Sequence, residues 1–405
     1  MENESDPIDS PYSWIRLGVT FAIAVIGNVG IWIYIAILPD VAQEYGVERA
    51  TASMPYVLTM IGFAFGNFGI GRIADRVGIA VAMTGATLLS GAGFAIAAQT
   101  GSIWTLAIVQ LFIGFGTGAS FAPLMADISH WFLRRRGIAV AIAASGNYIS
   151  GALWPFALSG VLENDGWRQV YLALALITIG LVVPLAVLLR RRLPSGASAT
   201  SEAIREDNAR QAAFSPRALQ RLLGLAGIGC CIAMSMPQVH IVALSVDLGF
   251  GAGVGTEMLA LMLMGGFVSR IVSGLIADRL GGVRTLLIGS TLQCLALFLY
   301  LPFDGLVSLY VVSLIFGLSQ GGIVPSYALI VREYLPAREA GARVGTVIMA
   351  TIIGMALGGF VSGWIYDLTG SYQMAFLNGI AWNFLNIGIM LFILSRTGRA
   401  RMVPA

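Results

Sequence analysis

Residues 264–284 read MGGFVSRIVSGLIADRLGGVR, a run of apolar and small residues that contains one arginine and ends in a charged turn. Arg270 lies eight residues before Asp278. At the rise of an α-helix this spacing places Arg270 about 12 Å inside the boundary of a membrane span. An ionised side chain at that depth costs at least about 2.5 to 3.5 kcal/mol, so it normally faces a cavity, a partner or a substrate. Arg270 is therefore the leading candidate for a functional residue.

The composition identifies an integral membrane protein. Hydrophobic residues make up 57% of the chain and charged residues only 11%, so a single aqueous core could not hide the apolar side chains. Apolar runs of membrane-spanning length recur twelve times, which predicts twelve transmembrane helices. The expected spans are 15–38, 51–72, 79–98, 103–126, 137–160, 168–189, 219–246, 257–277, 283–302, 306–330, 343–365 and 372–395.

The basic residues are distributed unevenly between the two sides of the membrane. All 24 are arginine and, with the N-terminus inside, 21 fall in cytoplasmic segments, whereas only Arg49 and Arg168 fall outside. This bias predicts that both termini are cytoplasmic. The acidic residues that precede Arg16 have the wrong polarity for a cleavable signal peptide. We expect a multi-pass protein of the cell inner (plasma) membrane, since an arginine-only, Ala- and Gly-rich composition is typical of bacterial proteins of high-GC coding.

An internal repeat divides the chain into two halves. Gly71–Gly78 reads GRIADRVG after the second span, and Gly274–Gly281 reads GLIADRLG after the eighth, at an offset of 203 residues. The same offset aligns Gly118 with Gly321. We expect two six-helix halves related by pseudo-two-fold symmetry, with a substrate site between them near the midplane. The expected segments are a cytoplasmic tail at 1–14, a bundle at 15–189, a cytoplasmic linker at 190–217, a second bundle at 218–395 and a cytoplasmic tail at 396–405.

The paired GxxADRxG loops, the twelve spans and the central linker resemble the major facilitator superfamily over essentially the whole chain. The resemblance implies the all-α major facilitator fold and transport by alternating access. It also implies that each loop aspartate contacts a neighbouring helix end and latches one conformational state. The residues of this latch are Asp75, Arg76, Asp278 and Arg279. A carboxylate near a helix N-terminus gains from the helix dipole, which agrees with the implied role.

A second segment narrows the resemblance. Residues 131–139 read WFLRRRGIA, and Ala144, Ser145 and Gly146 follow, which looks like the fourth-to-fifth helix region of the monocarboxylate porters and the oxalate/formate antiporters. In those families helix eight carries a substrate-binding arginine, and Arg270 falls at the corresponding place. The seventh-span phrase at 237–240, PQVH, is also similar. The chain departs from both families in having no lysine, which they use within the membrane.

Three charged or titratable residues each allow two interpretations. Arg270 fits a substrate anchor, because its planar guanidinium matches the two oxygens of a carboxylate, or a structural arginine that bonds a backbone carbonyl. His240, about 10 Å inside the outer boundary, fits a substrate or proton site or a hydrogen-bonded packing residue. Asp127 fits a proton site or an ion pair with Arg134–Arg136, and we favour the ion pair. Further substrate-binding candidates lie on the fifth and tenth spans, in segments that resemble the family's cavity wall: Asn147, Tyr148, Gln320 and Tyr327.

These observations predict a secondary transporter that moves a small monocarboxylate, a lactate- or pyruvate-like organic anion, with proton symport and with Arg270 as the anchor. The alternatives are an anion exchanger of the oxalate/formate type and a proton-coupled exporter of drugs or metabolites. The sequence has no nucleophile beside a base, no metal-ligand spacing and no P-loop, so neither an enzyme nor a metal or other cofactor is expected. The expected partners are the organic anion, protons and membrane lipid, with no nucleic acid, and the chain is expected to be a monomer.

Overall fold

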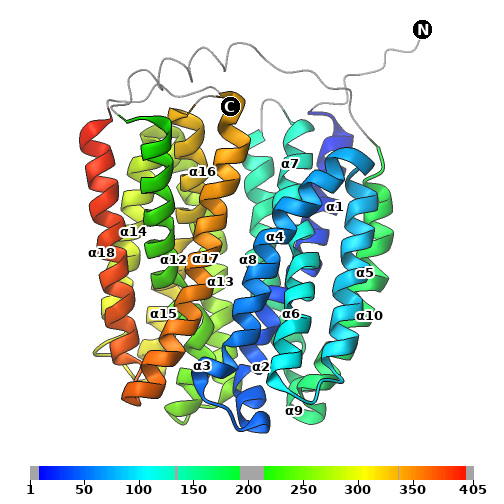
Figure 1. Cartoon of the computed structure of the whole chain (residues 1–405), viewed down its shortest axis with the longest axis vertical. Helices are drawn as coiled ribbons and strands as arrows, with labels where there is room; N and C mark the ends of the chain where they lie inside the picture. The colour runs from blue at the N-terminus through cyan, green and yellow to red at the C-terminus, as the bar shows by residue number, and fades with distance from the viewer. Residues whose placement is uncertain (1–8, 133–135, 192–213, 336, 398–405) are drawn as a thin grey trace. The chain divides into compact units, whose positions relative to one another are not determined.

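The computed structural model describes residues 9–132, 136–191, 214–335 and 337–397, and within these ranges every regular element is helical (Figure 1). Side chains are not described at 75, 129–130, 136–137, 278, 332 and 337–342. In the described ranges, 11 helical segments are long and apolar enough to cross a membrane. Together with α8, which covers the expected fifth span, they account for the predicted spans.

The helices of the first half begin at residue 11 and end at residue 188. They are α1 Pro11–Gly27, α2 Val29–Tyr45, α3 Arg49–Ala52, α4 Met54–Val77, α5 Ile79–Ala97, α6 Ile103–Thr117, a short 3-10 turn at Gly118–Ser120, α7 Ala122–His130, α8 Arg136–Ala157, α9 Ser159–Asp165 and α10 Trp167–Leu188. The expected linker at 190–217 falls mostly outside the described residues.

The helices of the second half begin at residue 216 and end at residue 396. They are α12 Pro216–Asp247, α13 Ala252–Leu280, α14 Gly282–Leu299, α15 Leu306–Gln320, α16 Ile323–Tyr334, α17 Ala337–Thr369 and α18 Gln373–Arg396. Three predicted spans are broken well inside their length: the first, the fourth and the tenth. The second and the fifth are interrupted only near one end, at Ser53 and at Leu158. Apolar length alone does not predict these breaks.

The described helices form two compact units. Unit 1 contains the helices before Pro194 together with Ile241–Leu263, and unit 2 contains the helices between Ser195 and His240 and those from Met264 onward. Each unit has its own apolar core, which buries one face of several helices. In unit 1 this core includes Ile23, Met83, Leu124 and Val182, and in unit 2 it includes Leu223, Leu286, Tyr327 and Met390.

The first span is broken at Asn28, which separates α1 from α2. Its carboxamide nitrogen donates to the Ala24 carbonyl at 2.8 Å and to the Ser120 carbonyl at 3.0 Å. The side chain therefore satisfies backbone acceptors on two helices, which an apolar residue could not do.

The fourth and tenth spans are broken at equivalent positions of the internal repeat. The first break follows Thr117 and includes Gly118, and the second is the pair Gly321 and Gly322 between α15 and α16. A side chain at either place would collide with the neighbouring helix. A Cβ on Gly118 would lie 2.5 Å from the Asn67 nitrogen, and a Cβ on Gly321 would lie 2.6 Å from the Arg270 nitrogen. Glycine at the break thus lets α4 and α13 approach the bent chain closely.

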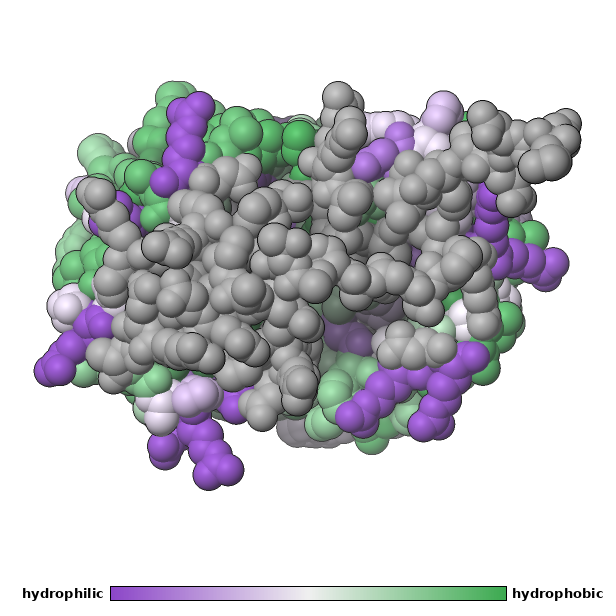
Figure 2. Space-filling view, turned by 90° about the horizontal axis from the view of Figure 1, so that it is seen from above, coloured by the Kyte–Doolittle hydropathy of each residue, from purple (hydrophilic) through white to green (hydrophobic). Residues whose placement is uncertain are grey.

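Several of the arginines that the sequence places on the cytoplasmic side have exposed side chains, among them Arg72, Arg76 and Arg279. Figure 2 shows hydrophilic side chains projecting at the margin of one end of the molecule, beside hydrophobic residues of the helix flanks. The two arginines expected on the opposite side are both paired with acids. Arg168 lies 2.5 Å from Glu44, and Arg49 lies 2.6 Å from Asp247.

The glycine contact at the second break yields a stability prediction. In Gly321→Ala the new Cβ overlaps the Gly266 carbonyl oxygen, so α13 must move, which costs about 1–3 kcal/mol. The matched control is Gly388→Ala on α18, where nothing lies within 4 Å of the added atom. Thermal unfolding of the detergent-purified proteins should show a lowered midpoint for Gly321→Ala and an unchanged or raised midpoint for Gly388→Ala. Equal midpoints in the two variants would show that the contact is not tight.

Candidate functional site

Arg270 lies in the middle of α13, against the break between α15 and α16. Its side chain is buried, with 6% of its surface exposed, and its Nε donates to the Gly321 carbonyl at 3.2 Å. This bond satisfies a carbonyl that the broken helix leaves without an intrahelical partner.

The internal repeat gives Arg270 a structural equivalent in unit 1. The offset of 203 residues relates it to Asn67 on α4. The Asn67 Oδ1 accepts from the Ala122 nitrogen at 2.9 Å, and its Nδ2 donates to the Phe63 carbonyl at 2.7 Å. A neutral carboxamide therefore supports the first break. At the second break Arg270 instead donates to a backbone carbonyl, a hydrogen bond that a neutral donor can also make.

Gln320 is the last residue of α15 and immediately precedes the glycine whose carbonyl Arg270 holds. It is completely buried, and its Oε1 accepts from the Nε2 of Gln238 on α12 at 2.6 Å. Gln238 was not among the sequence candidates. The signal was a second polar residue in the seventh span, two positions before His240, but its partner could not be read from the sequence.

His240 is completely buried on α12 and both of its ring nitrogens have neighbours in unit 2. Its Nε2 lies 2.7 Å from the Gly359 carbonyl, and its Nδ1 lies 3.2 Å from the Tyr372 hydroxyl. Since a carbonyl only accepts, Nε2 carries a proton, and a neutral ring then accepts from Tyr372 at Nδ1. This is the geometry of the hydrogen-bonded packing residue, one of the two interpretations of the sequence.

The remaining substrate candidates are divided between the units. Tyr327 lies in the core of unit 2, and its hydroxyl donates to the Asn386 Oδ1 at 2.7 Å. Asn147 and Tyr148 lie on α8 in unit 1, where Asn147 Oδ1 accepts from the Trp32 indole at 2.7 Å and Tyr148 is buried. In the structure Gln320 precedes the glycine whose carbonyl accepts from Arg270, and Tyr327 lies among core residues.

Asp127 forms an ion pair, but with a partner that the sequence did not suggest. Arg16 on α1 is 2% exposed, and its Nη2 lies 2.8 Å from the Asp127 Oδ2, while its Nε donates to the same oxygen at 3.0 Å. The Trp131 ring lies 4.5 Å from the Arg16 guanidinium carbon. The expected partners at 134–136 lie outside the described residues or have undescribed side chains.

The predicted latch is described only in part. Arg76 and Arg279 are exposed in the last turns of α4 and α13. The side chains of Asp75 and Asp278 lie outside the described residues. The contacts that these aspartates make stay a prediction.

Glu333 is a buried acid that the sequence analysis did not single out. It lies beyond the end of the tenth span, in the last turn of α16, and is 5% exposed. Both carboxyl oxygens accept from the Gly282 nitrogen at the start of α14, at 2.9 and 3.2 Å. Burial raises the pKa of Glu333 to about 7, although the hydrogen bond from Gly282 opposes this shift.

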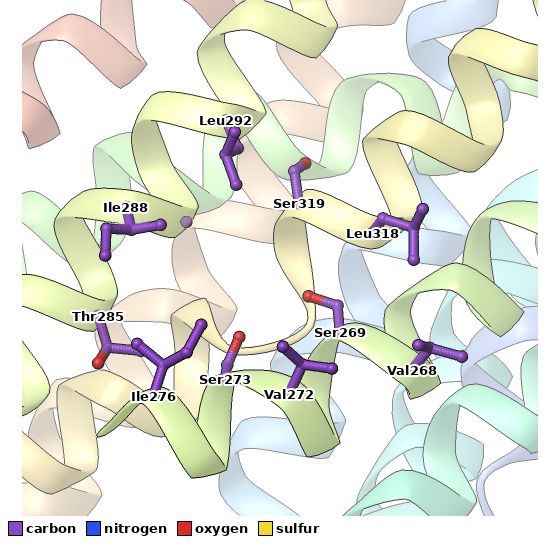
Figure 3. Close-up of a pocket in the computed structure, with 11 residues that line it drawn as sticks. Val268, Ser269, Val272, Ser273, Ile276, Thr285, Ile288, Leu292, Leu318 and Ser319 are labelled. Atoms are coloured by element: carbon purple, nitrogen blue, oxygen red, sulfur yellow. The ribbon is translucent and has the colours of Figure 1, made fainter. Parts of the chain in front are cut away.

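A small cavity of about 140 Å³ lies in unit 2 among α13, α14 and α15 (Figure 3). Its lining is mostly aliphatic, with the hydroxyl groups of Ser269, Ser273, Thr285 and Ser319, and Arg270 does not line it. Several lining residues are exposed at the surface of the unit, including Val272 at 47% and Leu292 at 48%. The cavity has no charged residue in its lining that could bind an anion, so the buried polar residues Arg270, Gln320 and Gln238 are the better candidate site. In the described ranges no group of three His, Cys, Asp or Glu residues could hold a metal ion.

Comparison with known proteins supports a transport role for these helices. The family model described as Major Facilitator Superfamily matches residues 20–341 and 221–404. Monocarboxylate transporter 13 of Rattus norvegicus is 25% identical over 96% of this chain and 91% of its own length. Monocarboxylate transporter 11 of Homo sapiens is 29% identical over 92% of this chain and 80% of its own length. Among solved structures, a bacterial homologue of the human lysosomal transporter Spinster matches with a TM-score of 0.71 at 16% identity, covering 98% of this chain and 100% of that one.

The raised pKa of Glu333 predicts a pH-dependent stability. Between its ordinary value of 4.5 and about 7, the folded protein keeps a proton that the unfolded chain releases. The free energy of unfolding therefore falls as the pH rises through this window. Glu333→Gln keeps the neutral form and should flatten this dependence, whereas Glu163→Gln, at an exposed position on α9, should not. The unfolding midpoints at about pH 5 and about pH 8 measure the difference, and identical slopes in all three proteins would refute a titrating Glu333.

Proposed function

The chain belongs to the Major Facilitator Superfamily and is a multi-pass membrane transporter rather than an enzyme, and we propose that it carries a small monocarboxylate whose carboxylate binds Arg270. The contrast between Arg270 and Asn67 is the observation that carries this proposal. Both residues support a helix break at equivalent places of the repeat, but only one is charged. Because a buried charge is costly in a membrane protein, the charge at 270 is best explained by an anionic ligand.

The chemistry of the guanidinium suits this ligand. Its planar fork donates two parallel hydrogen bonds to the two oxygens of one carboxylate, and it stays charged at any working pH. The relatives named monocarboxylate transporters support the same substrate class. A single cationic anchor fits a monoanion, because one guanidinium balances one negative charge.

The proposal includes alternating access with proton symport, in the inner membrane and with both termini in the cytoplasm. His240 and Asp127 are the proton-carrier candidates, and each has a close partner within its own unit, at Tyr372 and Arg16 respectively. A proton that enters together with the substrate needs no relay through either residue. The pairs Asp75–Arg76 and Asp278–Arg279 supply the latch of one conformational state.

The test replaces the arginine with the neutral residue that occupies the equivalent position in unit 1. Arg270→Asn removes the charge and keeps a side chain that can donate a hydrogen bond, so uptake of a labelled monocarboxylate into proteoliposomes should fall by about 10- to 100-fold. The control Arg396→Asn removes an exposed arginine on α18 and should leave uptake unchanged. An inward proton gradient should increase uptake by the wild type.

Two results would contradict the proposal. Full uptake by Arg270→Asn would show that the guanidinium is structural. Uptake that depends on a counter-anion inside the vesicle and ignores the pH gradient would instead favour the anion exchanger.

A further inference from the structure

We infer that the paired carboxamides of Gln238 and Gln320 form a second binding subsite beside Arg270, which recognises a hydroxyl group on the substrate. The inference rests on the proposed function and narrows it. The subsite would make the transporter select hydroxy-substituted monocarboxylates over keto and unsubstituted ones.

The two glutamines meet across the contact between α12 and α15, well away from water. They are 1% and 0% exposed, and they share one hydrogen bond, from Gln238 Nε2 to Gln320 Oε1 at 2.6 Å. The other polar atom of each carboxamide, Gln238 Oε1 and Gln320 Nε2, is buried without a hydrogen-bond partner among the described residues. The pair therefore has one acceptor and one donor left over.

This surplus does not depend on which way the amides are turned. If oxygen and nitrogen are exchanged in both groups, the hydrogen bond between them remains, and one donor and one acceptor are again left over. If only one group is turned, two like atoms face each other. In the bonded arrangement, the ligand that satisfies the pair must both donate and accept.

Three other fully buried carboxamides of unit 2 are satisfied at both ends. Gln293 bonds the carbonyl and the thiol of Cys230. Asn383 donates to the Ser290 carbonyl and accepts from Asn386. Asn386 also donates to the Ser290 hydroxyl and accepts from the Tyr327 hydroxyl. These fully buried amides of unit 2 are thus completely satisfied, whereas the partly buried Asn378 has an amide nitrogen without a hydrogen-bond partner among the described residues. The incomplete pair at 238 and 320 departs from this pattern, and a buried polar group left without a partner in a native protein calls for an explanation.

The pair is linked to Arg270 through Gly321, and this link points to the ligand group. Gln320 is bonded through one peptide unit to Gly321, whose carbonyl accepts from the Arg270 Nε at 3.2 Å. In a 2-hydroxy acid the hydroxyl is attached to the carbon next to the carboxylate. With the carboxylate on Arg270, the hydroxyl donates to Gln238 Oε1 and accepts from Gln320 Nε2. A keto oxygen only accepts, so it leaves the acceptor at Gln238 unpaired.

The experiment compares uptake of lactate, pyruvate and propionate into proteoliposomes, because these acids share a carbon skeleton and differ at one position. The wild type should take up lactate with a kcat/KM about 10-fold or more above that of the other two. The double variant Gln238→Leu with Gln320→Leu removes both partners together, which leaves no buried amide unpaired and favours folding. It should transport the three acids with nearly equal kcat/KM while retaining uptake of propionate.

The control is Gln293→Leu, which removes a satisfied buried amide of the same unit. It should lower the unfolding midpoint and leave the preference for lactate intact. Equal wild-type uptake of the three acids, or a preference for lactate that survives in the double variant, would overturn the subsite while leaving the anchor at Arg270 standing. Failure of the wild type to transport any of the three acids would overturn both the subsite and the proposed function.

Discussion

The close contact of α13 with the glycine pair at Gly321 and Gly322 is the interaction on which the candidate site depends. A helix broken inside a membrane leaves carbonyls that neither water nor the helix can satisfy. Glycine removes the side chains that would hold the neighbouring helix away, so Arg270 reaches the Gly321 carbonyl directly. The break also makes Gln320 the last residue of α15, next in the chain to the glycine that Arg270 bonds.

The internal repeat places a close glycine contact and a polar side chain at the helix break of each unit, but the two polar side chains differ in charge. In unit 1, Gly118 and Asn67 make the corresponding contact with neutral groups. In unit 2 the same position carries a charge, and the neighbouring helices α12 and α15 contribute an amide pair with unused hydrogen-bonding atoms. Both units therefore support a broken helix with a polar side chain at the equivalent position, and that side chain is charged only in unit 2.

The sequence alone predicted the features that depend on the length of apolar runs, on composition and on the spacing of the internal repeat. Arg270, the spans and the paired loops follow from apolar runs and from a repeat of 203 residues. The helix breaks were not predicted, because an apolar run reports how much chain is buried and not whether it bends. Asn28 and the adjacent glycines at 321 and 322 were the available signals.

Features that depend on which helix faces which could not be predicted from one sequence. The partnership of Gln238 with Gln320 and that of Arg16 with Asp127 join residues 82 and 111 positions apart. The partners of His240 and the burial of Glu333 also depend on which helix faces which, so the sequence alone did not predict them. The fifth and tenth spans carry the polar residues predicted to bind substrate, but whether such a residue lies in the core, as Tyr327 does, depends on helix rotation.

Equilibrium binding tests the central claim, that a carboxylate binds at Arg270, most directly. The unfolding midpoint of detergent-purified protein should be measured with monocarboxylates, dicarboxylates and cationic compounds, for the wild type and for Arg270→Asn. A ligand at about 100 times its Kd stabilises the native state by about 2.7 kcal/mol, which such a measurement detects. The account predicts that small monocarboxylates raise the midpoint of the wild type and not that of the variant. Equal stabilisation of both proteins, or stabilisation by cationic compounds alone, would contradict it.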